Sequence, residues 1–198
     1  MSLVAENISI AYGAKTLFAN FSRSFDCGVH AIVGANGSGK TSLLSCLAGI
    51  VKPRAGRVTV DGIDLYARPV DAKRRLSFMP DKPLVYPFMT GNELLRIVAS
   101  VKNDVVDEQV IESLNLGRHV DSTFRSMSFG TQRKFTLVAA LIGNPRVLLM
   151  DEPLNGLDKD SKEQFVRVIN EYRSTRVILF ATHDPELIER THAAEIHL

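Results

Sequence analysis

A glycine-rich segment between an apolar run and a helical pattern carries the clearest chemistry in this sequence. Residues 34–41 read GANGSGKT and fit the pattern G-x-x-x-x-G-K-[S/T]. Glycines let backbone N–H groups converge on phosphate oxygens, and a helix beginning at Lys40 adds the positive end of its dipole. The Lys40 ammonium can reach terminal phosphates, and the Thr41 hydroxyl can ligate Mg²⁺. The segment predicts a nucleotide-phosphate site with these contacts: Gly34, Asn36, Gly37, Ser38, Gly39, Lys40, Thr41 and Ser42.

Two adjacent carboxylates follow a second apolar run much later in the chain. The stretch RVLLMDEP places Asp151 and Glu152 at the carboxyl end of an apolar strand, where open α/β sheets bind ligands. Burying two acids is costly unless they face a cation or transfer protons. We expect Asp151 to hold Mg²⁺, directly or through water, and Glu152 to orient and deprotonate an attacking water. The alternative is that the pair caps the next helix.

The elements that must position these residues alternate along the chain. Short β-rich runs at 3–10, 17–25 and 29–34 precede the helical pattern that starts at Lys40, and residues 58–65 read as a hairpin around Asp61-Gly62. A middle block from about 83 to 126 reads as helices, which suggests a helical lobe inserted into an α/β core. The core then resumes with helices at 129–142, 159–173 and 185–191 and strands at 146–151, 176–182 and 193–198. Buried strands separated by a helix predict a parallel sheet.

Composition excludes several classes of protein. The chain has 198 residues, with 24 basic and 22 acidic side chains and a net charge of +2, so it lacks the basic excess typical of nucleic-acid binding. Cys27 and Cys46 are too few for a disulfide framework, which favours a reducing compartment. No apolar run reaches the ~18–20 residues of a membrane span, and the N-terminus lacks the features of a signal peptide. We therefore expect a cytoplasmic protein without direct membrane insertion.

With these segments in place, the sequence resembles the nucleotide-binding subunit of an ATP-binding cassette (ABC) transporter over nearly its whole length. Residues 127–131, MSFGT, resemble the family signature LSGGQ and keep Ser128 and Gly130, while the other three positions depart. The resemblance implies a P-loop NTPase core with a parallel sheet, an antiparallel β subdomain on the N-terminal side and an inserted helical lobe. It implies a single domain, 1–198, whose core is 1–82 and 127–198 and whose lobe is about 83–126.

The same resemblance suggests roles for further residues. Asp158 ends the segment NGLD, which is similar to the family's D-loop, and His183 matches the switch histidine that contacts the terminal phosphate. Ser128 and Gly130 of the signature cap the terminal phosphate bound to another subunit. Tyr12 matches the aromatic residue that stacks on adenine, although a lone tyrosine is more often a core or surface residue.

One position departs from the family in a way that bears on the metal. The family usually has Gln at the end of the strand before the helical lobe, and here LSFMPDKP puts Asp81 there. A carboxylate can still ligate Mg²⁺, but it adds negative charge beside Asp151, Glu152 and the phosphates. The alternative is that Asp81 is only a turn residue.

The resemblance implies an ATP-hydrolysing subunit that uses Mg²⁺ and drives export through separate membrane-spanning subunits, from the cytoplasmic face of the membrane. Two ATPase chains, a homodimer or a heterodimer, would meet head to tail and sandwich two MgATP molecules. The membrane subunits would contact the surface around 81–100, although its apolar residues (Tyr86, Phe88 and Met89) suit ordinary packing equally well. The alternative function is a nucleotide-dependent switch without transport, prompted by Asp81 and the divergent signature. A GTPase is disfavoured because no N-K-x-D motif is present.

Overall fold

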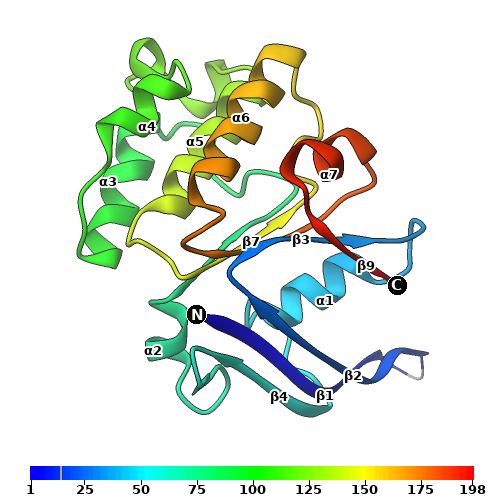
Figure 1. Cartoon of the computed structure of the whole chain (residues 1–198). Coiled ribbons are helices and arrows are strands. Elements are labelled where there is room, and N and C mark those ends of the chain that lie inside the picture. Colours follow the sequence, from blue (N-terminus) through cyan, green and yellow to red (C-terminus); the bar gives the residue numbers. More distant parts are fainter. Residues whose placement is uncertain (14) are drawn as a thin grey trace.

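The described residues form two β-sheets, and helices surround the larger one (Figure 1). The computed structural model describes residues 1–13 and 15–198, except for the side chains of Tyr12 and Lys15. The first sheet has the strand order β2-β1-β4-β5 with antiparallel neighbours, which confirms the expected antiparallel unit. Its strands are β1 (Ser2–Tyr12), β2 (Lys15–Asp26), β4 (Ala55–Val60) and β5 (Ile63–Asp64).

The second sheet has the order β6-β7-β8-β3-β9, and its paired strands are parallel, as predicted. Parallel strands end at the same edge of a sheet, so the segments that follow them in the chain lie close together there. That edge carries the end of β7 and the segments that follow β3, β6, β7 and β8, which hold the predicted phosphate loop and the predicted metal and proton-transfer residues. The strands are β3 (Gly28–Val33), β6 (Leu76–Met79), β7 (Val147–Asp151), β8 (Val177–Ala181) and β9 (Ala194–His197).

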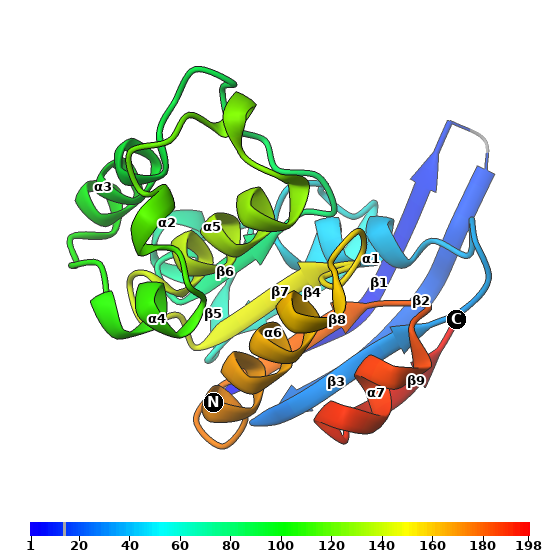
Figure 2. The same cartoon turned by 90° about the horizontal axis from the view of Figure 1, so that it is seen from above.

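Helices cover both faces of the parallel sheet (Figures 1 and 2). One face packs against α3 to α7, and the other packs against α1, α2 and the antiparallel sheet. The helices are α1 (Lys40–Leu47), α2 (Pro69–Lys73), α3 (Gly91–Lys102), α4 (Glu108–Ser113), α5 (Phe129–Leu141), α6 (Lys159–Tyr172) and α7 (Pro185–Thr191). None of the helices in the described ranges is long and apolar enough to cross a membrane.

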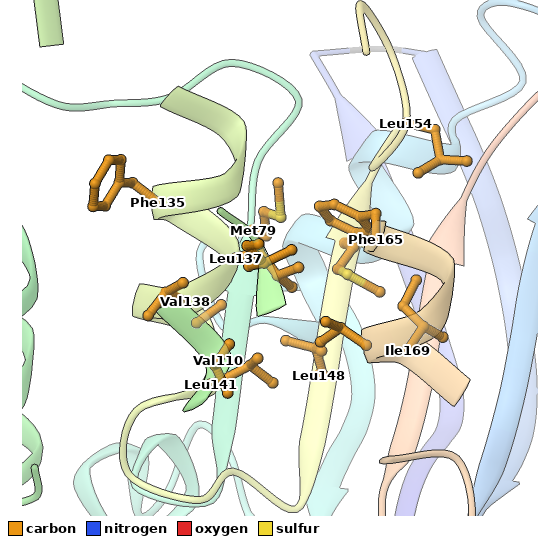
Figure 3. Packing of buried hydrophobic residues seen from close by; sticks show 14 of the residues in the cluster. Met79, Val110, Phe135, Leu137, Val138, Leu141, Leu148, Leu154, Phe165 and Ile169 are labelled. Atoms are coloured by element: carbon orange, nitrogen blue, oxygen red, sulfur yellow. The ribbon is translucent and has the colours of Figure 1, made fainter. Parts of the chain in front are cut away.

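Strand β7 illustrates how the sequence builds the core. Its side chains alternate between the two faces, since Leu148 and Met150 join the core under α5 and α6 while Val147 and Leu149 join the core around α1. Figure 3 shows Leu148 among side chains from α5 and α6, including Phe165. Each fully buried aliphatic side chain contributes about 1.5–3 kcal/mol. The carboxylates that follow β7 are therefore attached to a rigidly packed strand.

The segment from 83 to 126, which we propose to be a separate lobe, contains α3, α4 and two single 3₁₀ turns. Helix α3 begins with a capping box, in which the Thr90 hydroxyl accepts from the Glu93 N–H and the Glu93 carboxylate accepts from the Thr90 N–H. The predicted hairpin is also present, because Val60 pairs with Ile63 across Asp61 and Gly62. The short helix α2 was not predicted from the sequence.

Candidate nucleotide-binding and catalytic site

The glycine-rich loop lies between β3 and α1, as its pattern predicts. Gly37 and Gly39 have φ angles of 82° and 101°, a region that residues with a Cβ rarely adopt. At Gly34 a Cβ would lie only 2.8 Å from the Ser38 hydroxyl, so a side chain there would close the loop. These positions keep the backbone N–H groups free to face an anion.

The loop contains one buried polar side chain, Lys40, and one buried hydroxyl, that of the partly buried Ser38. Lys40 is 8% exposed, and its ammonium donates hydrogen bonds to the carbonyls of Gly34 (2.8 Å) and Ala35 (3.1 Å). The buried Ser38 hydroxyl has no hydrogen-bond partner among the described residues. A buried cation and an unpaired hydroxyl in one loop are the groups that a phosphate would satisfy.

The loop and the end of β7 share a cavity of about 260 Å³. Glu152 lines it together with residues from the loop, from α1 and from β2: Leu17, Asn36, Gly37, Gly39, Lys40, Thr41 and Ser42. Six of the eight predicted phosphate residues therefore line one cavity with the predicted general base, which is more than 100 positions away in the sequence.

Asp151 is only 5% exposed at the end of β7. Its pKa is raised, chiefly because burial disfavours the charged carboxylate, and the negative charges of Glu152 and Asp81 add to the rise. The Thr41 hydroxyl and the Lys40 ammonium act in the opposite direction. The proximity of Thr41 and Asp151 brings together two oxygen donors of the kind that Mg²⁺ prefers.

Among the described residues, no three His, Cys, Asp or Glu side chains are close enough to hold a metal ion by themselves. Mg²⁺ usually takes one or two protein oxygens and completes its shell with water and phosphate oxygens. The Thr41 hydroxyl and the Asp151 carboxylate fit that donor set.

Glu152 follows β7 in a left-handed backbone conformation, with φ of 45°, which is rare for a residue with a side chain. Its carboxylate Oε2 lies 3.0 Å from Nδ1 of His183, which follows β8. These two residues also line a smaller cavity of about 150 Å³ beside the larger one, together with Asn155 and Asp184. Glu152 thus lines both cavities.

Asp81 lies in the loop after β6 and is partly buried. Its carboxylate accepts a hydrogen bond of 3.1 Å from the Asn155 side-chain amide. Its negative charge contributes to the raised pKa of Asp151, so the two carboxylates are electrostatic neighbours. The sequence did not predict a partner for Asp81.

The signature segment, residues 127–131, begins helix α5. Ser128 is the N-cap, and its hydroxyl accepts from the Thr131 N–H (3.2 Å) and lies 2.9 Å from the Thr131 hydroxyl. Beside Gly130 the nearest side chains leave room for a Cβ. None of the hydrogen bonds found in the described residues joins Ser128 or Gly130 to the glycine-rich loop, and neither residue lines its cavity.

Of two further predicted residues, the structure describes the side chain of Asp158 but not that of Tyr12. Asp158 caps α6, and its carboxylate accepts from the Ser161 N–H at 2.8 Å. This backbone hydrogen bond is the largest cause of the lowered pKa of Asp158. The side chain of Tyr12, the predicted adenine contact, lies outside the described part of the chain.

The sequence reasoning missed two residues that touch this site. Asn155 holds the Asp81 carboxylate, and the buried Arg133 contacts the backbone of both Asp81 and Glu152. A signal for Arg133 was present, because its spacing from Leu137 and Leu141 places it on the buried face of α5.

The fold and the site together define a nucleoside-triphosphate-binding α/β protein, with a phosphate loop after one parallel strand and acids after another. The family model described as "ABC transporter" matches residues 20–155. The chain belongs to this family and is an ABC-type ATPase domain.

Individual relatives agree with this membership. The linearmycin resistance ATP-binding protein LnrL of Bacillus subtilis is 29% identical over 195 residues, which cover 94% of this chain and 63% of that protein. The chain spans less than two thirds of the length of the first curated relatives it matches, with shares of 63%, 10% and 10%.

Solved structures confirm the fold. A structure described as the ATP-binding subunit of an ABC transporter superposes with a TM-score of 0.91 at 25% identity, covering 100% of this chain and 86% of that chain. A dimeric ATP-binding cassette in a post-hydrolysis state, bound to ADP and phosphate, has a TM-score of 0.87 at 19% identity and covers 99% and 94%. The second likeness concerns the fold alone.

Proposed function

We propose that this chain binds MgATP and hydrolyses it to ADP and phosphate as one half of a head-to-tail dimer, and that closure of the dimer drives export through separate membrane-spanning subunits. The chain would act at the cytoplasmic face of the membrane. The observation that carries the proposal is the position of Glu152, which lines the cavity of the phosphate loop on one side and contacts His183 on the other.

In this proposal each group has a defined task. The backbone of residues 34–41 and the Lys40 ammonium bind the phosphates, while Thr41 and Asp151 would hold Mg²⁺, which neutralises phosphate charge when bound. Glu152 accepts a proton from water as the water oxygen attacks the terminal phosphorus, and the bond from that phosphorus to the ADP oxygen breaks. His183 orients the Glu152 carboxylate through its Nδ1 contact. The resemblance to the family implies that it also contacts the terminal phosphate once nucleotide is bound.

The proposal of a dimer rests on the separation of the signature segment from the phosphate loop within one copy of the chain. Ser128 and Gly130 share no hydrogen bond with the phosphate loop in the described residues and do not line its cavity. The exposed N-terminus of α5 therefore has its free N–H groups available to a phosphate held by another chain. A fold relative is described as dimeric and bound to ADP and phosphate, which agrees with the proposed pairing of two chains.

A groove beside the site supports contact with a membrane subunit. It has a volume of about 480 Å³ and runs between β6, α3 and α5, and its lining is largely apolar: Ile50, Leu84, Val85, Leu94, Val98 and Ala139. Leu84 is 87% exposed, and the exposed rings of Tyr86 and Phe88 stack on each other nearby. Apolar surface of this kind favours a protein partner, and a cytoplasmic segment of the membrane subunit would occupy it.

The direction of transport is supported by one relative, which is named for resistance to linearmycin. Resistance to a compound is consistent with its removal from the cell. The presence of Asp81, together with the divergent signature, favours a second candidate, a nucleotide-dependent switch with weak hydrolysis. The Asp81 carboxylate accepts a hydrogen bond from the Asn155 amide, and its charge acts on the neighbouring Asp151.

Phosphate release by the purified chain tests the hydrolysis, with Glu152→Gln as the inactive reference. Transport coupling needs a second experiment, in which proteins that copurify from membranes are identified by mass spectrometry and ATP turnover is compared with and without them. Leu84→Glu should abolish this copurification, whereas Val105→Glu, at a similarly exposed site (79%) away from the groove, should not. Copurification that survives Leu84→Glu would contradict the docking surface, and hydrolysis unchanged by the membrane protein would favour the switch.

A further inference from the structure

Arg133 is a charged residue in the middle of the molecule. It lies on α5, shortly after the signature segment, and it is 0% exposed. A buried guanidinium is costly unless its charge and its N–H groups are matched. Its surroundings therefore indicate what it does.

The guanidinium of Arg133 joins two loops that carry acids of the site. One terminal nitrogen, Nη1, donates to the carbonyl of Pro80 at 2.9 Å and to the carbonyl of Asp81. The other, Nη2, donates to the carbonyl of Glu152 at 2.6 Å and lies 3.5 Å from that of Asp151. Its acceptors are therefore backbone atoms of the segments that follow β6 and β7.

The backbone of Glu152 needs such support. Its φ of 45° is an unfavourable conformation for a residue with a side chain, and it persists only where neighbouring contacts hold it. The Glu152 N–H donates to the Ala181 carbonyl (2.9 Å), and the Glu152 carbonyl accepts from the Asn155 N–H (3.1 Å) as well as from Arg133. Of these hydrogen bonds to the Glu152 backbone, the one from Arg133 connects it to helix α5.

Hydrogen bonds connect Arg133 and three residues of the site in a closed network. Arg133 holds the backbone of Asp81, the Asp81 carboxylate accepts from the Asn155 amide, and Asn155 in turn donates to the Glu152 carbonyl. Burial lowers the pKa of Arg133, and the negative charges of Asp81, Asp151 and Glu152 act in the opposite direction by favouring its charged form. The helix that begins with the signature segment is thus tied to the acids at the carboxyl edge of the sheet.

We propose that Arg133 is a positioning residue for hydrolysis: it fixes the left-handed backbone of Glu152 and the loop of Asp81 relative to each other and to the signature helix. This inference rests on the proposed function. Arg133 does not line the phosphate-loop cavity and would touch neither nucleotide nor water. Its loss should therefore lower turnover much more than nucleotide affinity.

The test compares Arg133→Met and Arg133→Lys with a matched control. Arg176→Met removes another buried arginine, 7% exposed, which stacks on Tyr172 and contacts Asn144 at the opposite edge of the sheet. The measurements are kcat and KM for MgATP, the Kd of a fluorescent ATP analogue, and unfolding by urea. All three variants should lose stability, because each disturbs a buried charge.

The expected result is a kcat about 10- to 100-fold lower in Arg133→Met, as for a misplacement of about 1 Å at a reactive group, with the analogue Kd changed less than about 3-fold. Arg133→Lys should recover part of kcat, and Arg176→Met should keep wild-type kcat and KM. If Arg133→Met does not fold, a lowered kcat at unchanged Kd in Arg133→Lys supports the proposal, and wild-type kinetics in Arg133→Lys overturns it.

Two failures are distinguishable. A wild-type protein that hydrolyses ATP, with Arg133 variants no slower than Arg176→Met, overturns the role of Arg133 and leaves the proposed function standing. A wild-type protein that does not hydrolyse ATP, alone or with its membrane partner, overturns the proposed function and this inference with it.

Discussion

The imidazole Nδ1 of His183 lies 3.0 Å from the carboxylate Oε2 of Glu152, and this contact joins the ends of β8 and β7. His183 is largely exposed, with 67% of its side chain accessible, whereas the Glu152 side chain is 18% exposed. The packed strand β7 therefore sets the position of the acid, and the more exposed histidine contacts it from the smaller cavity that the two residues line.

From this contact we predict that His183→Ala lowers kcat by about 10²-fold, in the range typical of groups that assist proton transfer. MgATP affinity should change little, because the phosphate loop keeps its contacts. Phosphate release and equilibrium binding of a fluorescent ATP analogue measure the two quantities. His119→Ala, at a partly buried position in the 3₁₀ turn Gly117–His119 away from the site, is the control. A wild-type kcat in His183→Ala would remove His183 from the mechanism.

Lys40→Ala should weaken nucleotide binding at least 10-fold, because the buried ammonium is the cation of the loop and is held beside it by the Gly34 and Ala35 carbonyls. Isothermal titration with MgATP measures the change, and Lys52→Ala, at an exposed site, serves as the control. Affinity within about 2-fold of the wild type would count against the loop as the phosphate site.

Asp81→Gln restores the residue that the family usually has at this position and so tests the role of the acid. The substitution removes a negative charge close to Asp151 and Thr41, so we expect half-maximal hydrolysis to require several-fold more Mg²⁺. A magnesium titration of phosphate release gives the value, and Asp121→Asn, an exposed loop acid, is the comparison. Identical titrations would reduce Asp81 to a turn residue.

Asp184 provides a pH-dependent contribution to stability. Burial acts to raise its pKa, but the Lys162 ammonium at 2.9 Å and the backbone N–H groups that begin α7 outweigh burial, so the pKa of Asp184 is lowered. An acid with a lowered folded-state pKa stabilises the protein above its unfolded value of about 3.9, and this stabilisation disappears as the pH falls through the folded-state pKa.

Asp184→Asn keeps a good helix cap but removes the charge, so it should cost about 0.5–1 kcal/mol in urea unfolding at pH 7. The difference from the wild type should shrink as the pH approaches 3. In the background of Lys162→Met the substitution should cost less, because the ion pair is already lost. An equal cost at every pH would indicate that the charge of Asp184 is not involved.

Strand and helix patterns predicted most of the fold, because the elements that form the core are long and periodic. Helix α7 was predicted at 185–191, and the alternation along β7 and β8 follows from burial on both faces. Helix α2 was missed because its five residues bury only Ala72, too little for a periodic pattern. The motif pattern also placed the phosphate loop between a strand and a helix.

The contacts within the site were less accessible to sequence reasoning. The Asp81–Asn155 hydrogen bond depends on the conformations of two loops that are 74 positions apart, which local patterns do not encode. Arg133 donates to backbone carbonyls. Every residue type has a backbone carbonyl, so a sequence motif cannot reveal these contacts. The departures of the signature from LSGGQ likewise gave no indication that Phe129 would lie against Gly156.

The most direct test of the composite site is the mass of Glu152→Gln by light scattering, with and without MgATP. Removing the general base should lower phosphate release by 10²–10⁴-fold and leave ATP binding intact, so that the closed dimer accumulates. We expect the mass of one 21.9 kDa chain without nucleotide and twice that mass with MgATP. Adding Ser128→Arg should return the protein to the monomer. A Glu152→Gln protein that binds MgATP and remains monomeric would contradict the composite site.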